Sequence, residues 1–519
     1  MKPIRLMSGF FTVGVWTLLS RILGFLREVL LLSLIGPGPV MDAFVAAFRL
    51  PNMFRRFFAE GAFNAAFVPM FSKKFEGGED AQRFAQDAFS GLALVVLMLV
   101  GLAMVFMPGF VWLTAEGFSG DARFDMTVGY GRIVFPYILC MSLAALFSGI
   151  LNATGRFAVA AAAPVLLNIF VIAAMLAGYW AGGAVIDWLI WSIPLAGVAQ
   201  LALTWRAAAS AGFALRPTWP RWSPDMRAMI VIALPAALAS GVMQINLVVG
   251  QLVASQYENA VSWLFAADRL YQLPLGVVGI AVGIVLLPDL SRRLRAGDDE
   301  GARHALSRAG EIALVLTIPS AVALMVVPQT LVSVLFERGA ADVDDTAAIA
   351  TATAIYGLGL PAFVLQKVLQ PIYFARGDTR RPFNYALVAM VVNAALAVGL
   401  SPYIGWVAPA VATTFAGWAM LICLALGARK YGETARFDTR FRSRVWRIVA
   451  AAVLMGLALE LADALLDGLL ELAWWRGLGL LLLIGVGAVS FFSAGQLLGA
   501  FNLSEFKAAF RRRQGKKDI

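Results

Sequence analysis

The sequence predicts an all-α, polytopic membrane protein that crosses the bilayer about 14 times. Of its 519 residues, 60% are hydrophobic and only 14% are charged, whereas soluble domains carry about 25% charged residues. Apolar runs of about 20 residues, long enough to span a bilayer as helices, follow one another almost to the end of the chain. Because these runs are continuously apolar and do not alternate, an outer-membrane barrel is excluded.

Length and hydropathy place the individual spans. Pro51 interrupts the second of them. In chain order the predicted spans are 8–34, 40–72, 86–114, 128–152, 158–181, 184–206, 227–255, 259–290, 307–335, 346–374, 383–402, 405–428, 445–466 and 474–499.

Most Lys and Arg residues gather in alternate loops, such as KKFEGGEDAQR (73–83), RRLRAGDDEGAR (292–303) and RKYGETARFDTRFRSR (429–444). The positive-inside rule predicts that these loops and both termini are cytoplasmic. The net charge of +10 then serves topology and lipid contact. Binding to nucleic acid is disfavoured, since the basic residues are dispersed and no binding module accompanies them.

The chain also repeats itself weakly. Segments 49–80 and 269–300 both begin with Arg-Leu, reach a proline about twenty residues later, and end in serine, two basic residues and an acidic loop. A fainter pair relates Asn168 to Asn393. Elements that match in the same membrane orientation imply two parallel, pseudo-symmetric lobes of six helices each, with two extra C-terminal helices. The predicted domains are 1–222 (N-lobe), 223–435 (C-lobe) and 436–519; a chance recurrence of prolines and basic loop ends is the alternative.

The first span carries charges along a single stripe. On a helix with 100° per residue, Arg21, Gly24, Arg27 and Glu28 fall within a sector of roughly 120°, opposite a face of Leu, Val and Ile. The stripe therefore faces protein or water. Guanidinium forks suit phosphate oxygens, so several of them around one cavity would bind a pyrophosphate. The alternative is that these arginines form buried ion pairs that hold helices together.

Charge balance in the first two spans favours the ligand interpretation. Between Ser20 and Gly61 the positive side chains outnumber the negative ones by two, an excess that is hard to keep at membrane depth unless a cavity admits water or an anion. The side chains concerned are Arg21, Arg27, Arg49, Arg55 and Arg56 against Glu28, Asp42 and Glu60.

A second charged site lies in the eighth span. Asp268 and Arg269 precede Pro274, and Arg269 is expected to meet the first-lobe cluster across the interface; a local Asp268–Arg269 ion pair is the alternative. Pro51 and Pro274 are candidate kinks that let the lobes rock, although static packing kinks explain them equally well.

The usual parts of enzymes are missing from the sequence. His304 is the only histidine, and no phosphate-binding fingerprint occurs, so no ATPase is expected. The acidic loop residues at 298–300 and 342–345 are interpreted as solvated faces. The expected driving force is the membrane potential, a monovalent cation gradient or downstream consumption of product. No cofactor and no metal ligand is assigned.

Four stretches resemble the MurJ (MviN) lipid II flippases of the multidrug/oligosaccharidyl-lipid/polysaccharide exporter superfamily. They are SRILGFLRE (20–28), DAFVAAFRLPNMFRRFFAEG (42–61), AADRLYQLPLG (266–276) and YFARGDT (373–379). The resemblance implies 14 helices in two lobes around a cationic cavity, with a groove beside the last two helices for a polyprenyl tail. It also implies substrate-binding roles for Arg21, Arg27, Arg55, Arg269, Ser20, Glu28 and Asn52, and gating or structural roles for Asp42, Arg56, Glu60, Gly61, Asp268, Pro51 and Pro274.

Two positions depart from the family pattern. Glu28 stands where aspartate is frequent, and Gln272 stands where some members carry glutamate, which puts a proton or cation role at that position in doubt. The resemblance implies a monomeric, non-enzymatic flippase of the bacterial inner membrane, with lipid II, bilayer lipids and other cell-wall synthesis proteins as partners. A cation-coupled exporter of drugs or organic ions, a flippase for another polyprenyl-linked glycan and a membrane enzyme acting on a polyprenyl phosphate are the alternatives.

Overall fold

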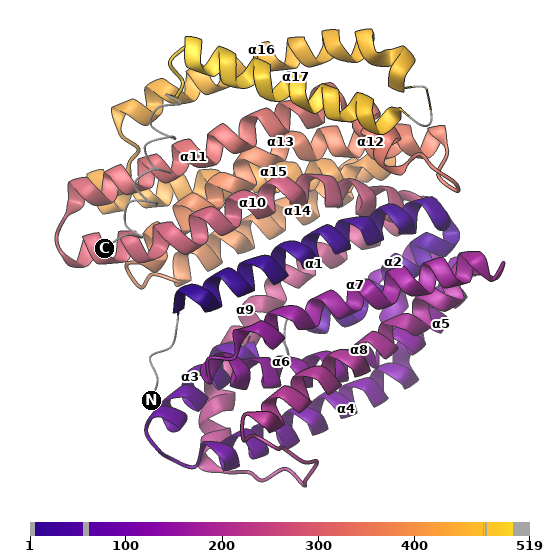
Figure 1. The fold of residues 1–519 in the computed structure, drawn as a ribbon, viewed down its shortest axis with the longest axis vertical. Helices are drawn as coiled ribbons and strands as arrows, with labels where there is room; N and C mark the ends of the chain where they lie inside the picture. Colours follow the sequence, from indigo (N-terminus) through magenta and orange to yellow (C-terminus); the bar gives the residue numbers. More distant parts are fainter. Residues whose placement is uncertain (1–5, 56–61, 471, 473–474, 502–519) are drawn as a thin grey trace. The chain divides into compact units, whose positions relative to one another are not determined.

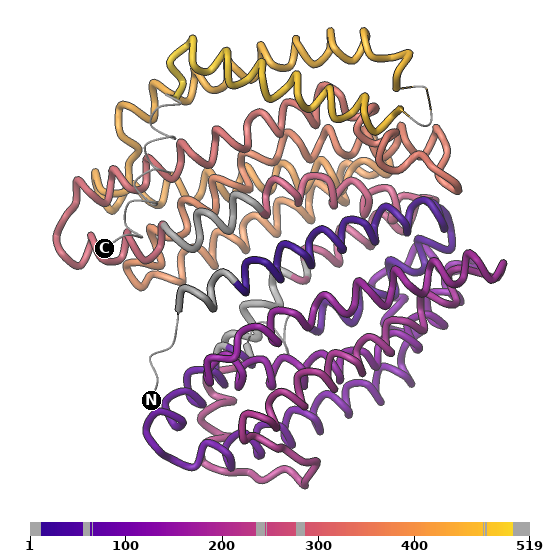
Figure 2. The backbone as a smooth tube through the Cα atoms, viewed as in Figure 1, coloured from indigo at the N-terminus to yellow at the C-terminus, as the bar shows by residue number. Residues whose placement is uncertain are grey.

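The structure, a computed structural model, describes residues 6–55, 62–470, 472 and 475–501, and in these residues the regular elements are all helical (Figure 1). Figure 2 traces the same chain as a tube. The α-helices are α1 (Leu6–Leu34), α2 (Pro39–Arg55), α3 (Ala62–Glu76), α4 (Ala81–Thr114), α5 (Ala122–Val134), α6 (Tyr137–Ala153), α7 (Phe157–Trp180), α8 (Val185–Ser210), α9 (Pro224–Ser255), α10 (Ala260–Arg295), α11 (Asp299–Val326), α12 (Pro328–Phe336), α13 (Val343–Phe374), α14 (Arg380–Ile404), α15 (Ala408–Ala428), α16 (Thr439–Leu470) and α17 (Arg476–Leu497). The 3-10 helices are η2 (Glu116–Phe118), η3 (Gly405–Val407) and η4 (Arg429–Ala435).

The predicted all-α membrane fold is confirmed. Each predicted span coincides with one helix or with two consecutive helices: the second with α2 and α3, the fourth with α5 and α6, and the ninth with α11 and α12. In the described part of the chain, 9 helical stretches are long and apolar enough to cross a membrane. The total of 14 crossings stays a prediction.

Two prolines that are candidate kinks, Pro51 and Pro274, lie inside helices and do not end them at once, and the kinks themselves stay a prediction. Helix α2 continues beyond Pro51 to Arg55, and α10 runs through Pro274 to Arg295. A proline removes one backbone hydrogen bond and need not end a helix whose other bonds and packing remain.

Helix α4 is bent near Phe106, where the backbone leaves helical geometry (φ −96°, ψ 19°). Pro108 follows two residues later and has no N–H to donate to the carbonyl four residues before it, that of Met104. Nε of Arg132, on α5, donates to this Met104 oxygen at 3.2 Å. The guanidinium therefore takes the place of the missing backbone donor.

We expect Arg132→Ala to lower the free energy of unfolding by about 1–2 kcal/mol, because it leaves the Met104 carbonyl without its donor in apolar surroundings. In a Pro108→Ala background the same change should cost much less, since alanine at position 108 supplies the N–H. Unfolding by SDS titration of both single variants and the double variant measures this coupling. Equal losses in the two backgrounds would contradict the assignment.

The described chain divides into two compact units, each with its own helix packing. The first unit runs to Ser262 and includes Arg338–Ala341; the second contains Trp263–Glu337 and the chain from Asp342 onward. In the first unit α1 packs on α7, α7 on α8, and α9 on α3 and α4. In the second, α16 and α17 lie side by side (Figure 1) and α16 packs on α11. The predicted domain limits at residues 222 and 435 are limits of the sequence repeat and stay a prediction.

Loops in the two units share one arrangement. Arg156, in the α6–α7 loop, donates to the hydroxyl (2.7 Å) and the carbonyl (3.1 Å) of Ser210 at the end of α8. Arg376, in the α13–α14 loop, donates to the hydroxyl of Thr434 (2.6 Å) in η4, which follows α15. In each unit an arginine of a loop therefore bonds a hydroxyl-bearing residue at or just beyond the end of a later α-helix.

The α13–α14 loop should make stability depend on acid pH. The Tyr431 hydroxyl donates to Asp378 at 2.7 Å and holds the pKa of that carboxyl below its usual value. A carboxyl whose pKa is lowered by folding stabilises the fold above its unfolded pKa, and this contribution is lost as pH falls through the folded pKa. We therefore expect thermal stability to fall below about pH 4 more steeply in the unaltered protein than in Asp378→Asn. Identical pH profiles of the melting temperature would contradict this.

Candidate functional site

Arg27 on α1 is held in place by two side chains. Its Nη2 donates to Oε1 of Glu28 at 2.5 Å, and its Nη1 donates to Oδ1 of Asn168, on α7, at 3.1 Å. The Asn168 amide nitrogen donates in turn to the Ser20 carbonyl at 3.0 Å. Glu28 and Asn168 are both buried (3% and 5% exposed), so the two side chains fix the direction of the guanidinium.

A small residue allows this contact between helices. A Cβ added at Gly24 would lie 3.8 Å from both polar atoms of the Asn168 side chain, so a larger side chain here would compete for the space that Asn168 occupies. The structure thus brings Ser20, Gly24, Arg27 and Glu28 together around Asn168, which sequence analysis had singled out only as a marker of the repeat.

Arg21 lies on the same helix and is exposed. Six residues separate it from Arg27, a rise of about 9 Å. The opposite face of α1 is apolar and outward, with Leu18, Ile22 and Leu26 between 44% and 60% exposed. The helix therefore presents an apolar face and, away from it, the side that carries both arginines.

At the end of α2, Asn52 and Arg55 occupy half-buried positions. The Asn52 amide nitrogen donates to the Phe48 carbonyl of its own helix at 2.9 Å, so in this structure it supports the backbone next to Pro51. Three further predicted positions, Arg56, Glu60 and Gly61, lie outside the described residues.

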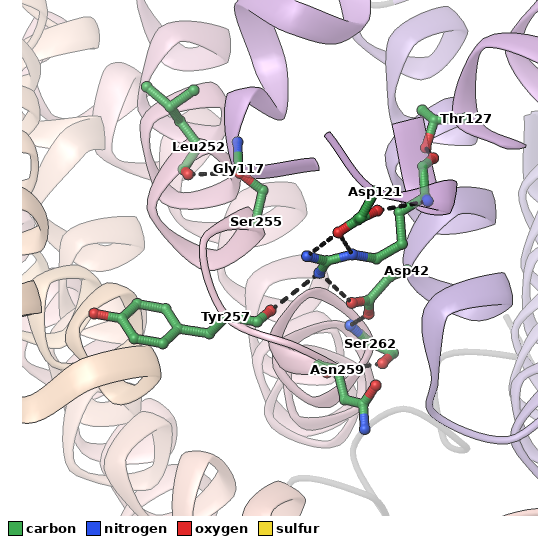
Figure 3. Close-up of polar contacts among 10 residues, drawn as sticks. Asp42, Gly117, Asp121, Thr127, Leu252, Ser255, Tyr257, Asn259 and Ser262 are labelled. Atoms are coloured by element: carbon green, nitrogen blue, oxygen red, sulfur yellow. Dashed lines mark hydrogen bonds and ion pairs between the residues drawn. The ribbon is translucent and has the colours of Figure 1, made fainter. Parts of the chain in front are cut away.

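Asp42 belongs to a different cluster, at the start of α2 (Figure 3). It is completely buried and accepts hydrogen bonds from the Ser262 N–H (2.8 Å), in the first turn of α10, and from the Arg123 guanidinium (3.5 Å). Arg123 also donates to Asp121 (2.8 Å) and to the Tyr257 carbonyl (3.3 Å). Asp42 is therefore satisfied by Arg123 and not by the arginines of the first two spans.

Sequence analysis missed Arg123. It lies between the predicted spans 86–114 and 128–152, and nothing in its local sequence links it to Asp42, 81 positions away. Its guanidinium also stacks over the Phe118 ring at 4.5 Å, so burial by an aromatic side chain accompanies the ion pair.

A second contact within the first unit holds the turn between α1 and α2 in place. The Ala340 N–H donates to the Ser33 carbonyl at 3.0 Å. Gly36 has a positive φ of 75°, and a Cβ there would lie 2.5 Å from the Ala340 carbonyl oxygen. The GPGP turn at 36–39 therefore serves as a close-packed docking point for residues 338–341 of the same unit.

In the second unit, Asp268 and Arg269 make separate contacts on α10. Gln272 donates to the Asp268 carboxylate, one turn away, while the Arg269 guanidinium lies over the Phe265 ring at 4.4 Å. Gln272 thus acts as a donor where a glutamate would repel Asp268. Arg269 belongs to the second unit and Arg21 and Arg27 to the first, so their convergence on one ligand stays a prediction.

The second unit also contains an apolar groove of about 270 Å³ beside the last two helices. Its walls come from α11, α12, α16 and α17, and Gly487 lets α17 approach Leu459 of α16, since a Cβ there would lie 3.1 Å from the leucine. The remaining walls include Val315, Pro319, Leu331, Met455 and Phe491.

Metal-ligating residues do not gather in the described ranges: no group of three or more His, Cys, Asp or Glu side chains there has a geometry suited to a metal ion. The acidic residues described above are instead used in hydrogen bonds and ion pairs with Arg27, Arg123 and Gln272.

Comparison with known proteins agrees with this architecture. A family model described as "Lipid II flippase MurJ" matches residues 31–477. "Probable lipid II flippase MurJ" of Rhizobium meliloti (strain 1021) is 44% identical over 521 residues, covering 98% of this chain and 97% of that protein. The solved structure "Lipid II flippase MurJ, inward closed conformation" has a TM-score of 0.79 at 24% identity, covering 93% of this chain and 98% of that one.

A more distant structure shares the fold. "Inward-facing conformation of a multidrug resistance MATE family transporter of the MOP superfamily" has a TM-score of 0.67 at 14% identity, covering 80% of this chain and 95% of that one. At such identities the two structures show the fold alone, whereas the family model and the rhizobial relative show the family. The predicted resemblance is confirmed: the chain belongs to the MurJ family.

Proposed function

We propose that this protein is a lipid II flippase, which moves undecaprenyl-pyrophosphate-linked peptidoglycan precursor from the inner to the outer leaflet by alternating access. The observation that carries the proposal is the fixed guanidinium of Arg27, oriented by Glu28 and Asn168, with exposed Arg21 on the same helix. Pre-oriented guanidinium donors suit phosphate oxygens. In this mechanism Arg269 of the second unit joins them around the pyrophosphate.

The same contacts bear on the alternatives. A cation-coupled exporter needs carboxylates available for a cation, yet Glu28 pairs with Arg27 and Asp42 pairs with Arg123. The excess of arginine therefore favours an anionic substrate. A flippase for a different polyprenyl-linked glycan has the same pyrophosphate chemistry, so the substrate assay below must separate the two.

The family and its apolar helices support a multi-pass protein of the bacterial inner membrane, acting as a transporter. We further propose that it is a monomer without enzymatic activity, that both termini are cytoplasmic, and that the membrane potential or a monovalent cation drives transport. The basic loops support this orientation. Lipid II and bilayer lipids are the proposed partners, together with other cell-wall synthesis proteins.

The polyprenyl tail is proposed to occupy the groove between α11, α12, α16 and α17. We expect Ala488→Trp, which adds a ring to the groove wall, to lower the flipping rate about tenfold, because displacing two methylenes of the tail costs about 1.6 kcal/mol. Val489→Trp is the matched control, since Val489 is 68% exposed and points away from the groove. Equal rates in the two variants would remove the groove from the mechanism.

The central test is reconstitution of the protein in proteoliposomes with fluorescent lipid II, followed by measurement of the fraction that reaches the opposite leaflet. Depletion in cells should in parallel cause lipid II to accumulate on the inner leaflet. Transport of another polyprenyl-linked glycan, with lipid II left in place, would favour the second candidate. Transport of organic cations with neither lipid moved would overturn the proposal.

A further inference from the structure

The segment between α8 and α9, residues 211–223, carries two highly exposed tryptophans. Trp219 is 86% exposed and Trp222 is 71% exposed. The segment is not helical, and Pro217 and Pro220 restrict its backbone. Large aromatic surfaces are costly to leave in water, so both rings are expected to have an apolar covering.

This segment is firmly attached to α4. The Gln86 side chain exchanges two hydrogen bonds with the backbone of Arg216, donating to its carbonyl (2.5 Å) and accepting from its N–H (3.0 Å). The hydroxyls of Ser90 and Thr218 are 2.9 Å apart and hydrogen-bonded. The tryptophans are therefore presented from a fixed support and not from a loose loop.

The attachment points set the depth of the segment in the membrane. Trp205, on α8, donates from its indole nitrogen to the Leu215 carbonyl at 3.1 Å, and Leu215 is itself buried. One predicted span begins at residue 86, and another ends at residue 206. Since the segment is bonded to Gln86 and Trp205, it lies at the level where α4 and α8 leave the hydrocarbon, where tryptophan is enriched in membrane proteins.

The charged side chains of this segment and its flanks indicate which lipids it binds. Between residues 205 and 227 the one acidic side chain is Asp225, and Lys74 pairs with it at 3.2 Å. The exposed basic side chains of this stretch are Arg206, Arg216, Arg221 and Arg227. Basic residues next to interfacial aromatic rings attract anionic headgroups.

We propose that residues 211–223 are an interfacial anchor that binds anionic phospholipid headgroups of the cytoplasmic leaflet. Trp219 and Trp222 insert at the boundary between headgroups and acyl chains, and the arginines contact the phosphates. The anchor rests on the proposed cytoplasmic orientation and does not depend on which lipid-linked glycan is transported. It fixes the depth of the connection between the two sequence halves while transport proceeds.

The depth is tested by spin labelling in nanodiscs. In a Cys140→Ala/Cys423→Ala background, Trp219→Cys and Trp222→Cys are labelled one at a time, so that the other tryptophan remains. We expect both labels to collide more with oxygen than with a water-soluble nickel complex. Glu76→Cys, exposed at the end of α3, is the matched aqueous control. Labels at 219 and 222 that are as accessible to nickel as the label at 76 would overturn the anchor and favour a protein partner.

The lipid class is tested with brominated lipids. Quenching of the emission that Trp219→Phe/Trp222→Phe removes should be stronger with brominated phosphatidylglycerol than with brominated phosphatidylcholine. Arg216→Gln and Arg221→Gln should each reduce this preference about fivefold, the factor expected for one basic residue near an anionic surface. Equal quenching by the two lipids would overturn the headgroup assignment.

The membrane orientation of the chain is measured in a separate experiment. A wrong orientation can then be distinguished from a segment that does not bind the membrane. An impermeant thiol reagent should label Glu76→Cys only after the membrane of spheroplasts is opened. Labelling from outside would reverse the proposed orientation even if the tryptophans prove to be membrane-inserted, and would place the anchor in the other leaflet.

Discussion

Replacement of Arg27 by alanine is expected to reduce lipid II flipping by about 10²-fold or more. A charged hydrogen bond contributes about 1.5–3 kcal/mol, and a guanidinium fork can make two of them to one pyrophosphate. The change also leaves the buried Glu28 carboxylate and Asn168 without the donor that each has in the structure. Initial rates in proteoliposomes, at matched protein density, measure the effect.

Arg27→Lys separates charge from geometry. Lysine keeps the positive charge, but its single ammonium cannot contact Glu28, Asn168 and a phosphate with the fixed fork of arginine. We therefore expect it to recover only a small part of the lost rate. Asn168→Ala should lower the rate less than Arg27→Ala does, since Asn168 orients the arginine and is not proposed to touch substrate.

Arg83→Ala is the control for this series. Arg83 is an exposed arginine in the first turn of α4, so its loss changes net charge equally without touching α1. Wild-type rates in both Arg27→Ala and Arg27→Lys would remove Arg27 from the mechanism. Equal losses in Arg83→Ala and Arg27→Ala would show that net charge alone is being measured.

Helix positions were predictable because each span is long and its apolar run is continuous. The bend in α4 was not. Several prolines lie inside helices, including Pro51 in α2 and Pro274 in α10, yet non-helical backbone occurs before Pro108. The Met104 carbonyl that Pro108 leaves without a backbone donor is bonded by Arg132 of α5, and that partner cannot be identified from the sequence of α4.

The candidate site was likewise predictable within single helices but not between them. Spacing on one helix placed Arg27 and Glu28 on a common stripe with Arg21, because helical periodicity relates nearby residues. The partner Asn168 comes from a helix 141 positions later in the chain, beyond the reach of periodicity. For Asp42 the family resemblance indicated a role, but its partners Arg123 and Ser262 depend on tertiary contacts alone.

The Asp42 cluster leads to the second large prediction, an effect on gating. The carboxylate binds the first turn of α10 and Arg123 at one end of the first unit. Removing one partner of a buried ion pair costs about 3–5 kcal/mol, and in Asp42→Ala the remaining Asp121–Arg123 pair should keep the cost near the lower limit. We propose that these bonds hold this end closed and that they break when the outward path opens.

Accessibility of one buried thiol tests the gate. Ser262→Cys keeps the backbone N–H that donates to Asp42, and residue 262 is fully buried. In a Cys140→Ala/Cys423→Ala background, Asp42→Ala should speed its labelling by an impermeant reagent about 100-fold, because a loss of about 3 kcal/mol shifts the opening equilibrium by that factor and slow labelling follows the open population. Exposed Ser119→Cys should label equally fast with and without Asp42. Unchanged labelling at position 262, with the protein still folded, would mean that Asp42 holds the helices together without gating transport.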